Sequence, residues 1–318
     1  MGVELLCTSH SPLINVDGQA PAEPTSRVDD LFGTLAGDLA TRPPKFVIQF
    51  GNDHNSGMAL KLMPPFMVAL RARAVGDFDT SQGPMLVDEA TGRALVKYLH
   101  GAGVDVATSY DAYLDHGFVV AQDRLFGGID KIPVIPIFIN CGGDLRTPLD
   151  RVLALGTAVG EFIRREHAAD DVLILGSGGL SHDPPLPDFM TSDGIMQQRM
   201  IDGTQWTAQS LRERTERVSE MGREHALNGG GLQALNPGWD RMILQHLAAG
   251  RLEDIAAMDD AEVVRLGGRG ASEIRNWLAA FAALRAVRGS YSAEELYYEA
   301  VPAWIVGFAA MRARACIA

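Results

Sequence analysis

The sequence predicts an α/β fold with a central, mostly parallel sheet, flanking helices and a helix-rich C-terminal third. Short apolar runs rich in β-branched residues alternate with longer segments of helical spacing, as expected when helices cover both faces of a sheet. Three of these runs lead directly into a loop that carries a histidine. Beyond Pro185 the pattern becomes mainly helical. Because no internal repeat or linker divides the chain, we expect a single domain over residues 1–318.

The first elements predict a strand–helix–strand unit. Residues 3–8 form an apolar run that leads to His10, and residues 46–50 form a second that leads to His54. Between them, Ser26 is a candidate N-cap for a helix that ends near residue 40. We expect both strands to end at the same edge of the sheet, where their histidines would meet.

The middle of the chain continues the alternation, although residues 61–79 fit either a strand or a loop. We expect helices at 85–99 and 149–167, and strands at 104–109, 133–139 and 172–175. Pro136 lacks a backbone donor and therefore predicts an irregularity in the 133–139 strand. The strand at 172–175 enters a glycine-rich turn that ends on His182.

The last third predicts helices at 207–227, 239–249, 259–266 and 272–287, with a glycine-rich break at 228–231. We expect residues 297–315 to form an aromatic loop followed by an apolar helix. This final helix could serve an oligomer interface, but packing in the core explains its apolar character equally well.

Composition excludes several classes of protein. The 318 residues carry a net charge of −12, from 28 basic and 40 acidic residues, which disfavours nucleic-acid binding. The three cysteines are far apart and form no paired motif, as is typical of a reducing compartment. No apolar run reaches 18 residues and no secretory signal is evident, so we expect a cytoplasmic protein without membrane association.

The eight histidines fall into two groups. Four fit ordinary surface or core roles and are assigned no function: His100, His167, His225 and His246. The other four lie in expected loops, three of them directly after a strand: His10, His54, His116 and His182. Imidazole is both a metal ligand and an acid/base group near neutral pH, so these four predict a metal site or an acid/base site.

Two histidines and one carboxylate would form the facial triad of non-heme Fe(II) oxygenases. Glu273 is one candidate carboxylate, since it follows a glycine-rich loop and begins a helix. An acidic residue in a first helical turn is also stabilising for electrostatic reasons alone. Asp53 and Asp115 are rivals, but each precedes a histidine and could equally hold the second nitrogen of a metal-bound histidine. The residues alone leave this choice open.

Nine motifs, in order along the chain, resemble the class III extradiol ring-cleavage dioxygenases of the protocatechuate 4,5-dioxygenase catalytic-subunit type. Within that family, the sequence is most similar to enzymes that act on 2,3-dihydroxyphenylpropionate. The motifs are LCTSHSPL (6–13), GNDHNSG (51–57), MPPF (63–66), VGDF (75–78), DHGF (115–118), LGSGGLSHDPP (175–185), LNPGWD (235–240), SEIRNWLAAFAA (272–283) and YYEAVPAWIVGF (297–308).

The resemblance implies Fe(II) bound by His10, His54 and Glu273. It implies that His116 and His182 form an acid/base pair, with His182 as the base toward a catechol hydroxyl and His116 as the proton donor. Their partners would be a catecholic substrate and O2, and the family implies a homo-oligomer. We also expect Asp115 to orient His116.

Three alternatives remain at this point. The same three ligands could hold zinc in a hydrolase. Distant relatives suggest a non-enzymatic binding protein, although all five motif residues are present here. A different 3-substituted catechol would change the substrate but not the chemistry. Candidate walls of the binding pocket are Pro184, Pro185, Tyr297 and Tyr298; no arginine or lysine stands out as a partner for a substrate carboxylate.

Overall fold

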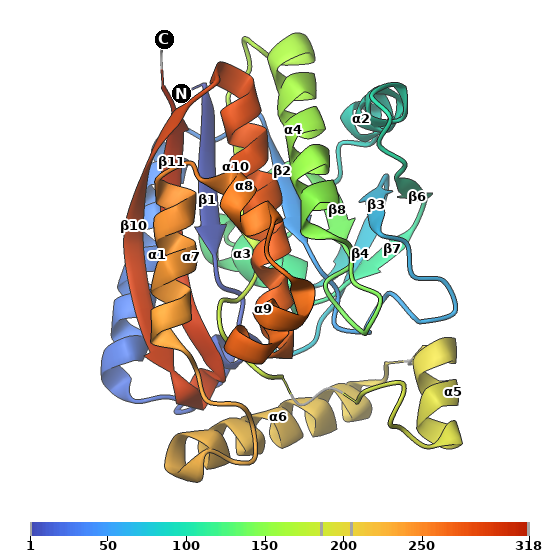
Figure 1. Ribbon diagram of the computed structural model, residues 1–318, viewed down its shortest axis with the longest axis vertical. Coiled ribbons are helices and arrows are strands. Elements are labelled where there is room, and N and C mark those ends of the chain that lie inside the picture. Colours follow the sequence, from blue (N-terminus) through green and yellow to red (C-terminus); the bar gives the residue numbers. More distant parts are fainter. Residues whose placement is uncertain (1, 185–186, 204–205, 317–318) are drawn as a thin grey trace.

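The computed structural model describes residues 2–184, 187–203 and 206–316, which form a layered α/β structure (Figure 1). Its main sheet has the strand order β10-β11-β1-β9-β2-β8-β3-β6, and a small second sheet has the order β5-β4-β7. The strands are β1 (Val3–Thr8), β2 (Phe46–Gly51), β3 (Phe66–Ala69), β4 (Ala72–Val75), β5 (Gln82–Pro84), β6 (Ala107–Ser109), β7 (Ala112–Leu114), β8 (Val134–Ile139), β9 (Val172–Ser177), β10 (Tyr291–Val301) and β11 (Val306–Ala315).

The centre of the main sheet is parallel, as the sequence predicts. β1 pairs in parallel with β9, β9 with β2, and β2 with β8. Every residue of β2, β8 and β9 is buried, which explains why these strands are mostly apolar and do not alternate with polar residues. The expected irregularity at Pro136 is wrong: β8 continues through it, because its pairing with β3 begins only at Ile137.

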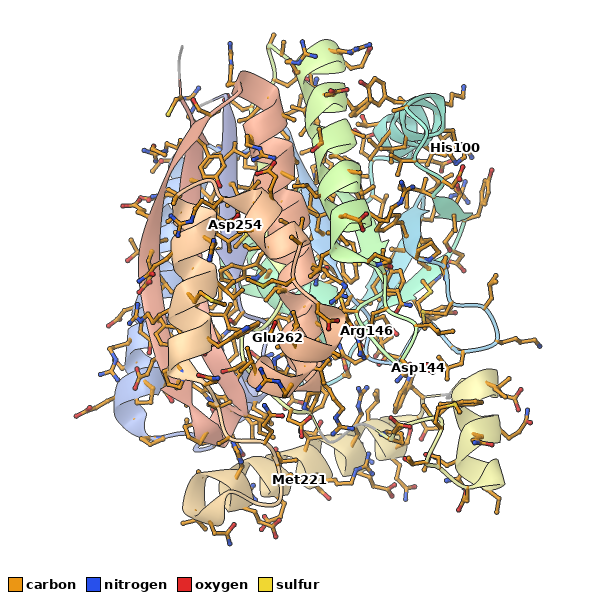
Figure 2. The ribbon with its side chains drawn as sticks, viewed as in Figure 1. His100, Asp144, Arg146, Met221, Asp254 and Glu262 are labelled. Carbon is orange, nitrogen blue, oxygen red and sulfur yellow. The ribbon has the colours of Figure 1, made fainter. Side chains whose placement is uncertain are left out.

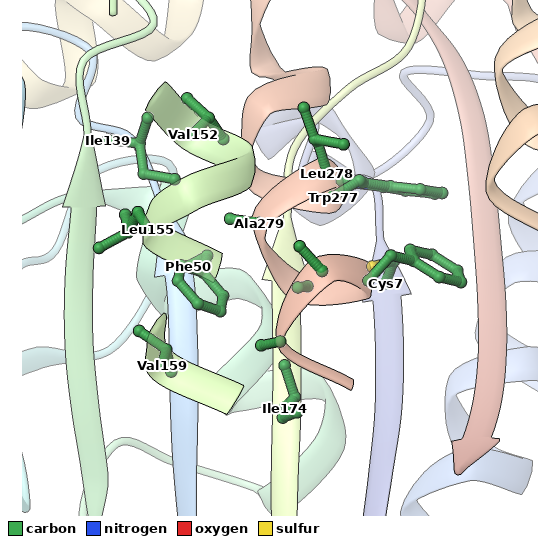
Figure 3. Packing of buried hydrophobic residues seen from close by; sticks show 14 of the residues in the cluster. Cys7, Phe50, Ile139, Val152, Leu155, Val159, Ile174, Trp277, Leu278 and Ala279 are labelled. Atoms are coloured by element: carbon green, nitrogen blue, oxygen red, sulfur yellow. The ribbon is translucent and has the colours of Figure 1, made fainter. Parts of the chain in front are cut away.

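Two helices pack side by side on one face of the sheet. They are α4 (Leu149–Glu166) and α10 (Ile274–Arg288), and α2 (Glu89–Gly101), α7 (Pro237–Ala248) and α8 (Leu252–Ala256) extend this layer (Figure 1). Figure 3 shows Val152, Leu155 and Val159 of α4 facing the strand residues Phe50 and Ile139. The two helices approach closely because glycines and alanines lie between them.

The Gly160 position gives a stability prediction. A methyl group built there would clash with the backbone oxygen of Ala283 in α10, and backbone cannot rotate away. Gly160→Ala is therefore expected to lower the free energy of unfolding by about 1–3 kcal/mol, as overpacking does. Gly37→Ala is the matched control: Gly37 is exposed on a helix with no atom near the added methyl, so it should stabilise by roughly 0.5–1 kcal/mol. Urea denaturation followed by circular dichroism measures the free energy of unfolding of both variants. Equal changes in the two variants would contradict the close contact between Gly160 and α10.

The opposite face is covered by α1 (Ala22–Thr41) and α3 (His116–Phe126). α1 buries Val28, Phe32, Leu35 and Leu39, a stripe with helical spacing. The expected N-cap at Ser26 is wrong, because the helix begins four residues earlier and tolerates Pro24 in its first turn. Likewise α2 begins only at Glu89, since the Asp88 side chain accepts the backbone N–H of Thr91 as its cap.

The C-terminal segment corrects the sequence prediction most strongly. Residues 297–315 form no α-helix; β10 and β11 are an antiparallel hairpin, and β11 pairs with β1. β11 lies inside the sheet and is buried over its first six residues, so it shows neither alternation nor helical spacing. The expected apolar helix from Val301 is therefore wrong, and the hairpin closes one side of the main sheet.

Two further helices lie across the end of the sheet where the central parallel strands finish: α5 (Gly194–Asp202) and α6 (Ala208–Asn228) (Figure 1). The 3-10 helices η1 (Pro12–Asn15), η2 (Arg269–Glu273) and η3 (Pro302–Trp304) and the short helix α9 (Asp260–Gly267) complete the structure. In the described part of the chain, every helix is too short or too polar to cross a membrane.

Candidate active site

The sheet topology brings together three of the histidines that the sequence singles out. β1, β9 and β2 are neighbours, and their carboxyl ends carry His10, His182 and His54. Thr8 lies opposite Ser177, and Phe50 lies opposite Gly176, so the three loops leave the sheet at one level. Parallel strands thus place residues from positions 10 to 182 in one site.

His10, His54 and Glu273 form a compact cluster. Nε2 of His54 lies 3.1 Å from Oε1 of Glu273, and Nε2 of His10 lies 3.2 Å from Oε2. One ligand atom from each residue falls within 4.8 Å of the others. His10 and Glu273 are each only 3% exposed. Two imidazoles and one carboxylate at this spacing could hold a metal ion as a facial triad, and we refer to these three residues as the triad.

The neighbours of the two histidines fix which nitrogen faces the centre. Nδ1 of His10 lies 3.0 Å from Oγ of Ser177, which itself donates to the backbone oxygen of Gly117, so His10 is the donor in this pair. Nδ1 of His54 lies 3.2 Å from a carboxylate oxygen of Asp115 and donates to it. These contacts orient both rings so that their Nε2 atoms face the centre of the cluster, where a metal ion would bind.

The site fits a divalent cation. Nε2 of His10 is buried and has no hydrogen-bond partner in the described part of the chain, despite its closeness to Glu273. Burial opposes ionisation of Glu273, but the charges and hydrogen bonds of His10 and His182 outweigh it and hold the pKa of this carboxyl well below its usual range. An ionised carboxylate beside two imidazole nitrogens, which release any bound proton when a metal binds, is a donor set that suits a divalent cation.

Glu273 reaches the site from η2, just before α10. Its Oε2 accepts the backbone N–H of Gly179 at 2.6 Å, and its Oε1 accepts from Nδ2 of Asn52 at 3.2 Å. The carboxylate is thus held between the β9 loop and the β2 loop. The Glu273 side chain points into the cluster. The structure therefore favours a role in this site over simple stabilisation of the start of a helix.

His182 lies beside the cluster without joining the triad. Its Nδ1 donates to the backbone oxygen of Leu180 at 2.9 Å, and its Nε2 lies 3.5 Å from Oε1 of Glu273. Gly179 and Gly270 flank the imidazole so closely that a side chain at either position would collide with it. The glycines therefore create the space that the ring occupies.

His116 is held by a residue that the sequence analysis missed. Its Nδ1 donates to Oδ2 of Asp77 at 2.6 Å, and its backbone N–H donates to Oδ1 at 2.9 Å. The expectation that Asp115 orients His116 is wrong, because the Asp115 carboxylate is 3.9 Å away and binds His54 instead. Asp77 belongs to the VGDF motif, so the signal was present in the sequence.

His116 also departs from the expected loop, since it is the first residue of α3. Burial, together with the nearby charge of His54, outweighs the carboxylate of Asp77 and lowers the pKa of His116. The opposite holds for His182, where burial is outweighed by Glu273 and the pKa is raised. The His116 ring stacks on His54 with centroids 4.2 Å apart, so it borders the triad directly.

The two rival carboxylates have other partners. Asp53 turns away and accepts the backbone N–H groups of Ser56, Gly57 and Met58. Burial and repulsion from Asp115 raise the pKa of Asp53 to about 7. Asp115 could join His54 and His116 in a second group of three possible ligands, but its oxygens already hold the ring and backbone of His54. Neither replaces Glu273 in the triad.

A cavity of about 980 Å³ opens over the cluster. The strand-end loops, η3 and the helices α5 and α6 line it, and its described lining includes His10, His54, His116, His182, Glu273, Pro184, Trp206 and Trp304. Pro184 is therefore a pocket wall, as considered, whereas Pro185 lies outside the described residues. Tyr297 and Tyr298 are absent from the described lining, and their hydroxyls bind Glu299 and Asp240.

The four histidines without an assigned function lie elsewhere. Figure 2 shows His100 on α2, far from Met221 of α6, and its Nε2 contacts the backbone oxygen of Val106. His167 and His246 contact acidic residues, and His225 contacts the backbone oxygen of Gly229 at the end of α6.

The chain is similar to known proteins over almost its whole length. Residues 4–309 match the family described as the catalytic LigB subunit of aromatic ring-opening dioxygenase. The chain belongs to this family. It is an extradiol dioxygenase, a metal-dependent oxidoreductase that acts on a catechol with O2.

Two relatives bear the name 2,3-dihydroxyphenylpropionate/2,3-dihydroxicinnamic acid 1,2-dioxygenase. The protein from Photorhabdus laumondii is 38% identical, over 99% of this chain and 98% of its own. The protein from Mycolicibacterium smegmatis is 40% identical, over 97% of each. The crystal structure of the uncharacterized protein JW3007 from Escherichia coli K12 covers 97% of this dioxygenase with a TM-score of 0.52. At 13% identity it shows the shared fold alone.

Proposed function

We propose that this dioxygenase uses Fe(II) to open the ring of 3-(2,3-dihydroxyphenyl)propanoate and its cinnamate analogue. The observation that supports this most is the buried cluster of His10, His54 and Glu273 with His116 and His182 beside it. The names of the two relatives support the substrate. The reaction would break a ring carbon–carbon bond beside the diol and place both atoms of O2 in the product.

His10, His54 and Glu273 would hold the iron, and their three positions would leave room for other ligands. When bound, Fe(II) supplies the redox chemistry between the catechol and O2. The chain contributes the rest: Ser177 and Asp115 each contact Nδ1 of a ligand imidazole and thereby turn its Nε2 toward the metal position.

His182 and His116 would move protons. We propose His182 as the base that takes the catechol proton through Nε2, since Leu180 occupies its Nδ1. His116 would give a proton to the developing product through its own Nε2, since Asp77 occupies Nδ1. Because the pKa of His116 is lowered, it is neutral at rest and must first receive the proton that it later donates.

The deciding experiment measures O2 uptake by ferrous-loaded protein with several 3-substituted catechols. We expect one O2 consumed per catechol and a yellow ring-opened product, fastest with 3-(2,3-dihydroxyphenyl)propanoate. Faster turnover of a 3-alkylcatechol would support the ring-cleavage reaction but change the assigned substrate. No uptake with any catechol would overturn the proposal, and hydrolytic activity with zinc alone would favour a hydrolase.

We further propose that the enzyme is a cytoplasmic homo-oligomer in which residues 1–318 act as one domain. The single domain is supported by the pairing of β11, in the C-terminal hairpin, with the N-terminal strand β1, because both ends of the chain then contribute to one sheet.

A further inference from the structure

The cavity has a wall of unusual charge for so acidic a protein. The chain carries a net charge of −12, yet the described lining beyond the histidines and Glu273 includes three arginines and a single acidic residue. The arginines are Arg199, Arg214 and Arg217, and the acidic residue is Glu213. All four come from α5 and α6, opposite the strand ends. The wall that faces the metal ligands is therefore cationic.

Helical spacing sets this wall. Ser210, Glu213, Arg214, Arg217 and Val218 recur at the three- and four-residue intervals of one helix face, and this face of α6 is turned toward the cavity. Met196, Arg199 and Met200 do the same on α5. Each helix thus presents an arginine beside apolar side chains.

The Arg214 guanidinium is occupied by contacts with other residues of the protein. Arg214 is only 9% exposed, and its guanidinium donates to Oγ of Ser56 at 2.8 Å and contacts Oδ2 of Asp77 at 3.4 Å. The guanidinium also lies over the rings of Phe78 and Trp206. These contacts connect Arg214 to Asp77, the aspartate that holds His116. Arg214 is therefore a positioning residue, and it lies on the same side of the cavity as His116.

Among the described residues, Arg217 and Arg199 lack contacts of this kind. Neither makes a hydrogen bond or an ion pair with any residue that the structure describes, and both are exposed to the solvent that fills the cavity mouth. Arg217 lies three residues after Arg214, about 4.5 Å further along the helix axis. A two-carbon arm on a catechol extends by roughly the same length from the ring.

We propose that Arg217, supported by Arg199, binds the carboxylate of the substrate side chain and selects carboxyalkyl catechols over neutral ones. This inference rests on the proposed function and adds the residues that determine specificity. A planar guanidinium donates two parallel hydrogen bonds to a carboxylate, which gives orientation as well as affinity. Met196, Met200 and Val218 would contact the carbon arm between the ring and the carboxylate.

The test compares 3-(2,3-dihydroxyphenyl)propanoate with its amide, which keeps the shape and removes the charge. In Arg217→Gln, kcat/KM for the acid is expected to fall about 10- to 100-fold, mainly through KM, while the amide stays within about twofold. Arg199→Gln should show a smaller loss of the same kind. Arg212→Gln is the matched control, since Arg212 is exposed on the same helix but does not line the cavity.

A binding measurement separates this inference from the proposed function. Trp206 and Trp304 line the cavity, so their fluorescence can follow 3-phenylpropanoate and 3-phenylpropanamide without any turnover. We expect wild type to prefer the acid at least tenfold and Arg217→Gln to lose that preference. Equal binding of acid and amide by wild type, or an unchanged preference in Arg217→Gln, would overturn the inference. Absent O2 uptake with an intact acid preference would instead overturn the ring-cleavage reaction alone.

Discussion

Glu273→Ala is expected to reduce bound iron from about one ion per chain to a small fraction of that value. Glu273 supplies the only carboxylate of the triad, and its oxygens lie 3.1 and 3.2 Å from the two imidazole nitrogens. Removing it leaves two neutral ligands, which hold a divalent cation weakly. His10→Ala should behave in the same way. Metal analysis of anaerobically prepared protein, together with loss of O2 uptake, measures the effect.

Glu262→Ala is the control for this experiment. Glu262 is exposed on α9 and pairs only with Arg265 of the same helix among the described residues (Figure 2). Its replacement should leave iron content and turnover unchanged. Full iron content in Glu273→Ala would contradict the ligand assignment, and a rival carboxylate such as Asp115 would then have to be tested.

His116→Ala and His182→Ala are expected to keep the iron and to lose turnover by about 10²- to 10⁴-fold, the usual contribution of a general acid or base. Neither residue belongs to the triad: His116 is held by Asp77, and His182 lies between two glycine-rich loops. The readout is therefore the pair of iron content and kcat, measured on the same preparations.

Two outcomes would separate the roles of these histidines further. Loss of iron in His182→Ala would show that His182 is a ligand, since its Nε2 already lies 3.5 Å from Glu273. Retained turnover in His116→Ala would remove it from the proton-transfer pair. His225→Ala is a useful control because His225 is buried at the end of α6 and binds only a backbone oxygen among the described residues.

The sequence by itself determined the chemistry available to the protein. Apolar runs ending in loops with His10, His54 and His182 predicted strand ends that converge, because side chains at the carboxyl ends of parallel strands share one edge. The family resemblance implied Glu273 as the carboxylate among the candidates and implied acid/base roles for His116 and His182. The sequence also predicted α4, α6 and α10. Of these, α4 leaves one face exposed, whereas α10 is buried on all sides from Ile274 to Leu284.

Only the tertiary structure decided the contacts between distant segments. Burial on both faces removed the alternation from β11, so its strand could not be distinguished from a helix by pattern. Asp77 rather than Asp115 holds His116, because side-chain direction depends on how the small sheet packs against α3. The strand order β1-β9-β2 gathered the three histidines, and the placement of α5 and α6 across the sheet end gave the cavity its arginines. Local sequence encodes which groups are present, whereas long-range packing fixes which of them meet.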